Sequence, residues 1–352
     1  MLDFINEQKS CWQKLKEENR PIFIYGMGNG AEKILKNLSF FNIKIEGIFA
    51  SDEFVRGHSF LGYKVKRLSE VEELYDDFVI ILAFAASYIS LIDKIYILAN
   101  KHTLYVPDVP VFGDGLFTYD YCLKHKNEIS EVYSLLEDKI SKDTFSNILN
   151  YKISGNIDYL SKATTEKNDV YENILKVSND EVYMDLGAYN GDTIKEFLSY
   201  TNQKYKYIYA LEPDNKNFKK LKKYTEELNN IEIYNNPIWK KDEQILFSSQ
   251  NGRQSSIHKN GNLINAKSID GLLGNSPISL LKMDVEGSEY EAILGGKNTI
   301  KTHKPKLMIS LYHRNEDIFK IPLLIKELNP HYKLFIRHQL YIPAWETNLY
   351  AL

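Results

Sequence analysis

The feature that most constrains the fold is an alternation of short apolar runs with charged, amphipathic segments, which occurs twice along the chain. In the first half, apolar runs end near Tyr25, Phe49 and Phe84, and segments of helical spacing separate them. The alternation restarts near Val170 and continues to the last residues. Such runs are typical of buried parallel strands, and the segments between them of the helices that cover a sheet. The sequence therefore predicts an α/β protein with two three-layer units, the second a full doubly wound domain.

The length of 352 residues suits about two domains. We predict a smaller Rossmann-like α/β domain over residues 1–110, a helical connector over 111–165 and the doubly wound domain over 166–352. The connector lacks strand-like runs, and residues 121–142 and 143–163 have helical periodicity. It contains few Pro or Gly residues, which argues against a loose linker.

Charge and cysteine content narrow the functional class. The chain has 44 Lys and Arg against 47 Asp and Glu, a net charge of −3, so no global electrostatic attraction to nucleic acid is expected. The longest uncharged stretch, residues 78–92, is shorter than the roughly 20 residues that cross a bilayer. The acidic N-terminus does not resemble a signal peptide. Cys11 and Cys122 are too few for a disulfide framework, so reduced thiols and a cytoplasmic location are expected.

The strongest motif lies at the first strand of the second unit, in the segment Asp185-Leu-Gly-Ala-Tyr-Asn-Gly-Asp-Thr193. Gly187 and Gly191 allow a tight turn and a close approach of the backbone to a ligand. Their G-x-x-x-G spacing differs from the G-x-G-x-x-G of diphosphate cofactors, which disfavours such a cofactor. Asp185 ends the strand as an acceptor or as the counter-ion of a cation. The alternative is a plain glycine turn between a strand and a helix.

Two acidic segments follow at the ends of later strands. Glu212 lies 212 − 187 = 25 residues after Gly187, at the end of the next strand, where a carboxylate binds the hydroxyls of a ribose. Asp284 and Glu286 follow the apolar run 279–283, and strand ends of an open α/β sheet face the ligand crevice. The glycine turn and Glu212 together predict a ligand that contains adenosine. For Asp284 and Glu286, a solvated loop is an equal alternative.

These segments, in this order, resemble the FkbM family of S-adenosylmethionine-dependent methyltransferases over roughly residues 165–352. The similarity extends to Ser268-Ile-Asp-Gly-Leu272, Lys282-Met-Asp-Val-Glu-Gly287 and Lys306-Leu-Met-Ile-Ser-Leu-Tyr-His313. Tyr189 departs from the family, which usually has Asn there. The resemblance implies a class I methyltransferase sheet of seven strands with the last antiparallel, S-adenosylmethionine as cofactor, and a hydroxyl acceptor.

The resemblance also implies roles for individual residues. Asp185, Gly187, Ala188 and Gly191 would bind the methionine part of the cofactor. Glu212 would hold the ribose, and Asn236 and Ile238 would lie near the adenine. Asp284 and Glu286 would border the acceptor, with Glu286 as a substrate-binding residue.

Transfer to a hydroxyl requires removal of its proton, and His313 and Asp284 are the predicted catalytic residues. His313 follows a strand whose end opens on the same crevice, although it could instead only hold a loop. Asp284, Glu286 and Glu289 offer oxygen ligands suited to Mg²⁺, but such close spacing is not a metal signature. We therefore assign no metal site, and a divalent metal ion stays an alternative that the sequence does not favour. Tyr341 and Trp345 lie late in the chain, where they could cap the acceptor pocket.

The first unit carries its own glycine loop. Gly26, Gly28 and Gly30 fit a G-x-G-x-x-G/A pattern between a strand and a helix, and Asp52 follows 52 − 30 = 22 residues after Gly30. This unit resembles the N-terminal domain of bacterial sugar-modifying enzymes, which implies that these four residues bind a nucleotide or nucleotide sugar as part of the substrate. The alternative is a docking domain whose loop binds nothing.

Together, these observations predict a bacterial O-methyltransferase that modifies a hydroxyl of a saccharide or nucleotide-linked sugar in polysaccharide biosynthesis. Its partners would be small molecules or glycans, with no nucleic acid and no membrane span. Two alternatives stay open at this point: a nicotinamide-dependent oxidoreductase that uses the N-terminal glycine loop, and a non-catalytic nucleotide-sugar-binding scaffold. The sequence specifies neither the acceptor nor the oligomeric state.

Overall fold

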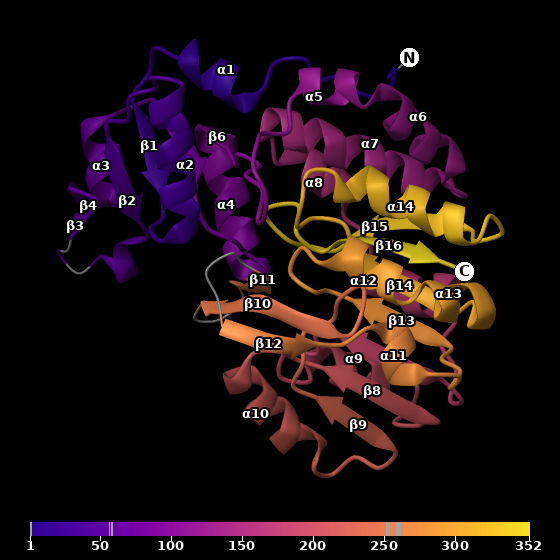
Figure 1. Cartoon of the computed structure of the whole chain (residues 1–352). Coiled ribbons are helices and arrows are strands. Elements are labelled where there is room, and N and C mark those ends of the chain that lie inside the picture. Colours follow the sequence, from indigo (N-terminus) through magenta and orange to yellow (C-terminus); the bar gives the residue numbers. More distant parts are fainter. Residues whose placement is uncertain (1, 56, 58, 251–253, 258–261) are drawn as a thin grey trace.

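Two largely parallel sheets, one in each half of the chain, form the frame of the protein (Figure 1). The computed structural model describes residues 2–55, 57, 59–250, 254–257 and 262–352. No helix in this described part of the chain has the length and apolar character that a bilayer crossing requires.

The first sheet has the strand order β3-β4-β2-β1-β5-β6, with only β3 antiparallel to its neighbour. The apolar runs predicted to be strands are β1, β2 and β5, and every residue of these three strands is buried. The strands are β1 (Ile22–Tyr25), β2 (Gly47–Ala50), β3 (Ser59–Phe60), β4 (Tyr63–Arg67), β5 (Val79–Leu82) and β6 (Thr103–Tyr105). The helices of this unit are α1 (Cys11–Lys16), α2 (Asn29–Phe40), η1 (Asp52–Phe54), α3 (Leu68–Leu74) and α4 (Ile89–Lys101).

The predicted connector is helical and packs closely against both units. Its elements are α5 (Tyr119–Lys124), α6 (Lys126–Leu135), α7 (Lys139–Ser154) and α8 (Asp158–Ala163), and the π-helix η2 (Asp169–Ile174) follows at the start of the second unit. One hydrophobic core runs from Phe23 of β1 through Ile148 of α7 to Ile309 of the second sheet. The two sheets and the connector therefore share a core, which holds them in a defined relation.

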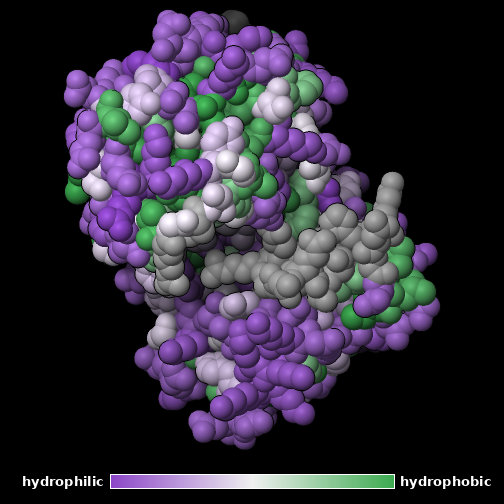
Figure 2. Space-filling model, turned by 90° about the vertical axis from the view of Figure 1, so that its left-hand side faces the viewer, coloured by the Kyte–Doolittle hydropathy of each residue, from purple (hydrophilic) through white to green (hydrophobic). Residues whose placement is uncertain are grey.

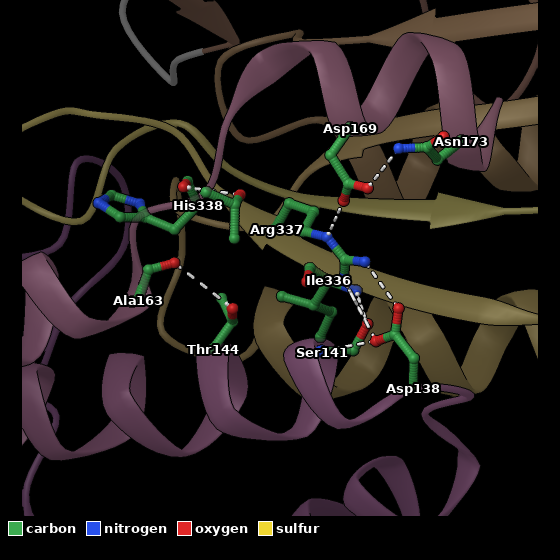
Figure 3. A network of polar contacts seen from close by, with 10 residues as sticks. Asp138, Ser141, Thr144, Ala163, Asp169, Asn173, Ile336, Arg337 and His338 are labelled. Atoms are coloured by element: carbon green, nitrogen blue, oxygen red, sulfur yellow. Dashed lines mark hydrogen bonds and ion pairs between the residues drawn. The ribbon is translucent and has the colours of Figure 1, made fainter. Parts of the chain in front are cut away.

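A buried arginine anchors the connector to the second sheet (Figure 3). Arg337 donates from Nε to Asp169 at 2.9 Å and from its two terminal nitrogens to Asp138 at 2.6 Å and Ser141 at 2.8 Å. Its side chain is almost fully buried. If α7 or η2 moved away from β15 (Leu334–His338), the buried Arg337 charge would lose a counter-ion. The network therefore holds these helices against the strand.

The second sheet has the order β15-β16-β14-β13-β7-β8-β9, in which only β16 runs antiparallel to both of its neighbours. This confirms the predicted fold of seven strands with the last antiparallel. The other strands are β7 (Val182–Leu186), β8 (Tyr207–Leu211), β9 (Ile231–Tyr234), β13 (Leu280–Met283), β14 (Lys306–Ser310) and β16 (Thr347–Ala351). The helices are α9 (Asp192–Tyr200), α10 (Asn215–Thr225), α11 (Ile269–Leu273), α12 (Glu289–Gly295), α13 (Lys297–His303) and α14 (Asp317–Leu328).

A third, antiparallel sheet was not predicted. It consists of β10 (Glu243–Gln250), β11 (Gln254–Ile257) and β12 (Asn262–Ala266). Its sequence is rich in Ser, Gln and Asn and lacks the apolar runs from which the other strands were predicted. In Figure 1 it lies between α4 of the first unit and the lower part of the second.

Candidate active site

The glycine turn after β7 brings the backbone close to the neighbouring strand end. Gly187 has a φ of +83°, and a Cβ atom placed there would lie 1.9 Å from the carbonyl oxygen of Asp284. The N–H groups of Gly187 and Ala188 donate to the carbonyl of Leu211 at 3.0 and 2.9 Å. Gly191, with a φ of +91°, then precedes α9. Only glycine fits position 187 without moving the strand beside it.

A buried ion pair lies beneath this turn. Asp185 is fully buried, and its Oδ1 lies 3.1 Å from Nζ of Lys282 on β13. Lys282 also donates to the carbonyl oxygen of Gly187 at 2.8 Å. Burial alone would lower the pKa of Lys282, but Asp185 and Asp284 outweigh it and raise that pKa. Asp185 therefore supports the turn through Lys282 and is not among the residues that line the cavity above it.

Lys282 is a residue to which the sequence reasoning assigned no role. The signal was present, because a lysine inside the apolar run Leu280–Met283 must find a partner when the strand is buried. Its register supplies that partner, since Lys282 pairs with Asp185 in the parallel β7–β13 ladder.

Glu212 follows β8 and is held by backbone donors. Its Oε2 accepts from the N–H of Tyr189 and its Oε1 from the N–H of Asp214, both at 2.9 Å. Burial raises the pKa of Glu212 to about 7, although these two hydrogen bonds act in the opposite direction. The carboxylate is thus oriented before any ligand arrives, and each oxygen retains a lone pair for a further donor.

An acidic cluster surrounds His313 at the ends of β13 and β14. Nδ1 of His313 lies 2.9 Å from Oε1 of Glu289, and Nε2 lies 3.4 Å from Asp284 and 3.5 Å from Glu286. Burial alone would lower the pKa of His313, but the three carboxylates raise it to about 10. At neutral pH both nitrogens of the ring are therefore protonated, and the resulting imidazolium is the counter-ion of the cluster.

Glu286 differs from its neighbours in this cluster. Burial raises its pKa to about 8, against the opposing effect of His313 and with the help of Asp284. Its backbone has a φ of +53°, which places it on the sharp turn before Gly287. Asp284 accepts a hydrogen bond from the Tyr312 hydroxyl at 3.1 Å.

These groups converge on a cavity of about 750 Å³. Figure 2 shows that the molecular surface is hollowed between its upper and lower parts. The structure brings seven of the predicted site residues together on the cavity wall, namely Gly187, Glu212, Asn236, Ile238, Asp284, Glu286 and His313. Ala188 and Gly191 belong to the adjacent turn and are not lining residues.

The predicted residues of the N-terminal loop are not among the cavity lining. Gly26 lies against the Phe84 ring, and Gly30 lies so close to the Ala83 carbonyl that a Cβ atom would come within 2.3 Å of it. Asp52 is exposed and accepts from the N–H of Ser69 at 3.3 Å. The first unit nevertheless reaches the cavity by another route, through Ser87 and Ile89.

A metal ion is a second use for part of the acidic cluster. Asp284, Glu289 and His313 each offer one ligand atom, and these atoms lie within 4.8 Å of one another. Carboxylate oxygens suit Mg²⁺ or Mn²⁺, whereas an imidazole nitrogen suits Zn²⁺, Fe²⁺ or Ni²⁺. Protonated His313 already pairs with Asp284 and Glu289, so the cluster contains a cation of its own, although this single charge does not balance every carboxylate.

His338, the other histidine near the end of the second sheet, has no place in this site. It is fully buried beside Arg337 (Figure 3), and its Nδ1 lies 3.0 Å from the Thr347 hydroxyl. Burial lowers its pKa to about 4, which keeps the ring neutral.

Two segments of the chain match known protein families. Residues 185–343 match the methyltransferase FkbM domain, and residues 18–97 match the C2185-like N-terminal domain. No curated protein matches the chain.

Among solved structures, a methyltransferase FkbM from Methylobacillus flagellatus is 19% identical, with a TM-score of 0.72 over 99% of this chain and 92% of that one. An rRNA methylase from Streptococcus thermophilus is 15% identical over 50% of this chain and 87% of that one, with a TM-score of 0.32. A fibrillarin from Aeropyrum pernix with bound S-adenosyl-L-methionine is 11% identical over 49% and 66%, with a TM-score of 0.31.

Proposed function

Since the chain belongs to the FkbM methyltransferase family through residues 185–343, we propose that it transfers the methyl group of S-adenosylmethionine to a hydroxyl of a saccharide, free or nucleotide-linked. The observation that carries this proposal is the shared cavity of the glycine turn, Glu212 and the Asp284–Glu286–His313 cluster. Donor-binding and proton-accepting groups thereby face the same space.

The cofactor part of the proposal uses the turn and the buried acid. Glu212 accepts hydrogen bonds from both ribose hydroxyls, because its two oxygens are already oriented by backbone N–H groups. Because Gly187 has no side chain, the methionine part of the cofactor can approach the backbone closely. Asn236 and Ile238 border the adenine. The carboxylates around the cavity favour a cofactor that carries a sulfonium cation.

The chemical step is an in-line displacement. The acceptor oxygen attacks the methyl carbon, a C–O bond forms, the C–S bond breaks, and S-adenosylhomocysteine leaves with the bonding electron pair. Positioning of the two reactants accounts for most of what the protein must supply. The acceptor proton moves to a carboxylate as the oxygen attacks.

We assign this proton to Glu286. A pKa of about 8 places the carboxyl near the pH at which a general base is most effective. His313, predicted from the sequence as a base, is already protonated and orients Asp284 and Glu286 as a positioning residue. Asp284, with Tyr312, borders the acceptor hydroxyl.

Two measurements test this function. Isothermal titration of the whole protein with S-adenosylhomocysteine should show one binding site per chain, whereas heat with NAD⁺ and none with S-adenosylhomocysteine would refute the assignment. Incubation with methyl-labelled S-adenosylmethionine and bacterial glycans should then label a saccharide as a methyl ether, which survives mild alkali. Label that mild alkali releases would indicate an ester and contradict hydroxyl methylation.

A further inference from the structure

The cavity wall that faces the acidic cluster is built jointly by the two units. The loop between β15 and β16 pairs with the loop after β5, through hydrogen bonds between Ala86 and Ile342 at 2.7 and 2.9 Å. Ser87 and Ile89 line the cavity on one side of this joint. Gln339 and Trp345 line it on the other. The N-terminal unit therefore helps to shape the space beyond the cofactor.

Gln339 lines this space and has a side-chain donor without a partner. The side chain is 8% exposed, and its amide nitrogen is buried with no hydrogen-bond partner among the described residues. A buried donor without a partner is energetically unfavourable, so we expect a ligand oxygen to accept from it. The group is uncharged, and its natural partner is a hydroxyl or ring oxygen.

Trp345 and Tyr341 add aromatic surface next to this amide. Their ring centroids are 5.9 Å apart and their planes are tilted by 34°. Both rings line the cavity. Aromatic rings combine a large apolar face with a polar edge, and this suits a ligand that alternates C–H faces with hydroxyl groups.

The charge of the cavity opposes a phosphorylated ligand. Six lining residues are acidic, namely Glu166, Asp192, Glu212, Asp284, Glu286 and Glu346. The described lining residues also include two lysines, protonated His313 and no arginine. His313 is already paired with Asp284, Glu286 and Glu289.

Both lysines are already engaged. Lys167 lies 2.7 Å from Glu196, and Lys282 pairs with Asp185. The N-terminus of α9, which could attract an anion, carries Asp192 in its first turn. A diphosphate bound here would meet carboxylates without the free Arg or Lys that normally holds phosphate.

We propose that the acceptor is an uncharged, unphosphorylated saccharide, held by Gln339 and Trp345 beneath the loop after β5, and not a nucleotide sugar. This inference rests on the proposed methyltransferase function and specifies its substrate class.

The test uses the whole protein loaded with S-adenosylhomocysteine. Saturation-transfer NMR compares methyl glycosides of glucose, galactose, mannose and rhamnose with the nucleoside-diphosphate forms of the same sugars, with and without Mg²⁺. At least one methyl glycoside should bind at least about tenfold more tightly than its nucleotide form. Tighter binding of a nucleotide sugar in either condition would overturn the inference, as would a lack of binding by every glycoside.

Single substitutions test where the methyl glycoside binds. Trp345→Ala and Gln339→Ala should each weaken glycoside binding by about tenfold or more and leave the affinity for S-adenosylhomocysteine unchanged. Tyr88→Ala is the matched control, because Tyr88 lies between Ser87 and Ile89 but is 76% exposed and outside the cavity lining. Equal glycoside affinity in all three variants would contradict the assigned place. If the unmodified protein did not bind S-adenosylhomocysteine, that result would instead refute the proposed function itself.

Discussion

The two units contain the same local pattern, a buried strand followed by a glycine turn and a helix, yet their turns differ in what surrounds them. In the second unit, Gly187 packs onto the Asp284 backbone above a buried Asp185–Lys282 pair. In the first unit, the Phe84 ring fills the space against Gly26, and a Cβ atom at Gly28 would contact nothing.

The acids of the second strands differ in the same way. Glu212 is 6% exposed and is oriented by two backbone N–H groups, whereas Asp52 is exposed. A hydrogen bond from Ser69 lowers the pKa of Asp52, whereas burial raises that of Glu212. The comparison teaches that a glycine turn becomes a candidate site when a buried, pre-oriented acid and a cavity accompany it.

The largest effect is expected from the ion pair under the second turn. Lys282→Met leaves Asp185 buried without a counter-ion, so the free energy of unfolding should fall by about 3–5 kcal/mol, measured by urea denaturation. Lys33→Met is the matched change at the first loop, where Lys33 donates to the carbonyls of Pro110 and Val111. It should cost about 1 kcal/mol. The double variant Asp185→Leu/Lys282→Met should regain much of the lost stability. Equal losses in the free energy of unfolding for Lys282→Met and Lys33→Met would contradict this difference between the two turns.

The second effect concerns the two acids. Glu212→Ala removes two hydrogen bonds to the ribose, each worth about 1.5–3 kcal/mol, so affinity for S-adenosylhomocysteine should fall by about 100-fold or more. Asp52→Ala should leave that affinity unchanged, and circular dichroism should confirm that both variants fold. If Asp52→Ala weakened binding as much, the cofactor would belong to the first loop.

The third effect is a pH dependence. Glu286 must lose its proton to act as a base, so kcat/KM should rise with pH and level off above a pH of about 8. Below that pH it should fall by about tenfold per unit. Glu286→Gln should lower kcat by roughly 100-fold or more and flatten the profile, whereas Asp52→Asn should alter neither. A midpoint near pH 10 that persists in Glu286→Gln would return the role of base to His313.

The smallest effect is expected from chelation. Because protonated His313 already pairs with both Asp284 and Glu289, we expect EDTA to leave methyl transfer unchanged. Activity that EDTA abolishes and Mg²⁺ or Mn²⁺ restores would show that these three residues hold a metal ion. The second turn would then differ from the first by a metal centre as well.

Much of the fold was predictable because burial leaves a mark on the sequence. The buried strands appeared as apolar runs, such as the run 279–283 that contains β13. The polar strands β10 to β12 left no such mark. In the candidate site, Gly187, Glu212 and Asp284 were predicted, but the partner of Lys282 and the unused donor of Gln339 depend on contacts between distant segments.

The sequence by itself determined which buried strands form the two parallel sheets, where the glycine turns lie and which acids end the strands, because these follow from local periodicity and from the backbone freedom of glycine. The tertiary structure decided what those acids do. The carboxylates around His313 make it a cation against the effect of burial, and burial gives Glu286 a pKa of about 8. The tertiary structure also brings Ser87 and Ile89 of the first unit to the cavity, whereas the glycine loop of that unit does not line it. Electrostatic interaction and desolvation depend on distances in space, which local sequence patterns do not contain.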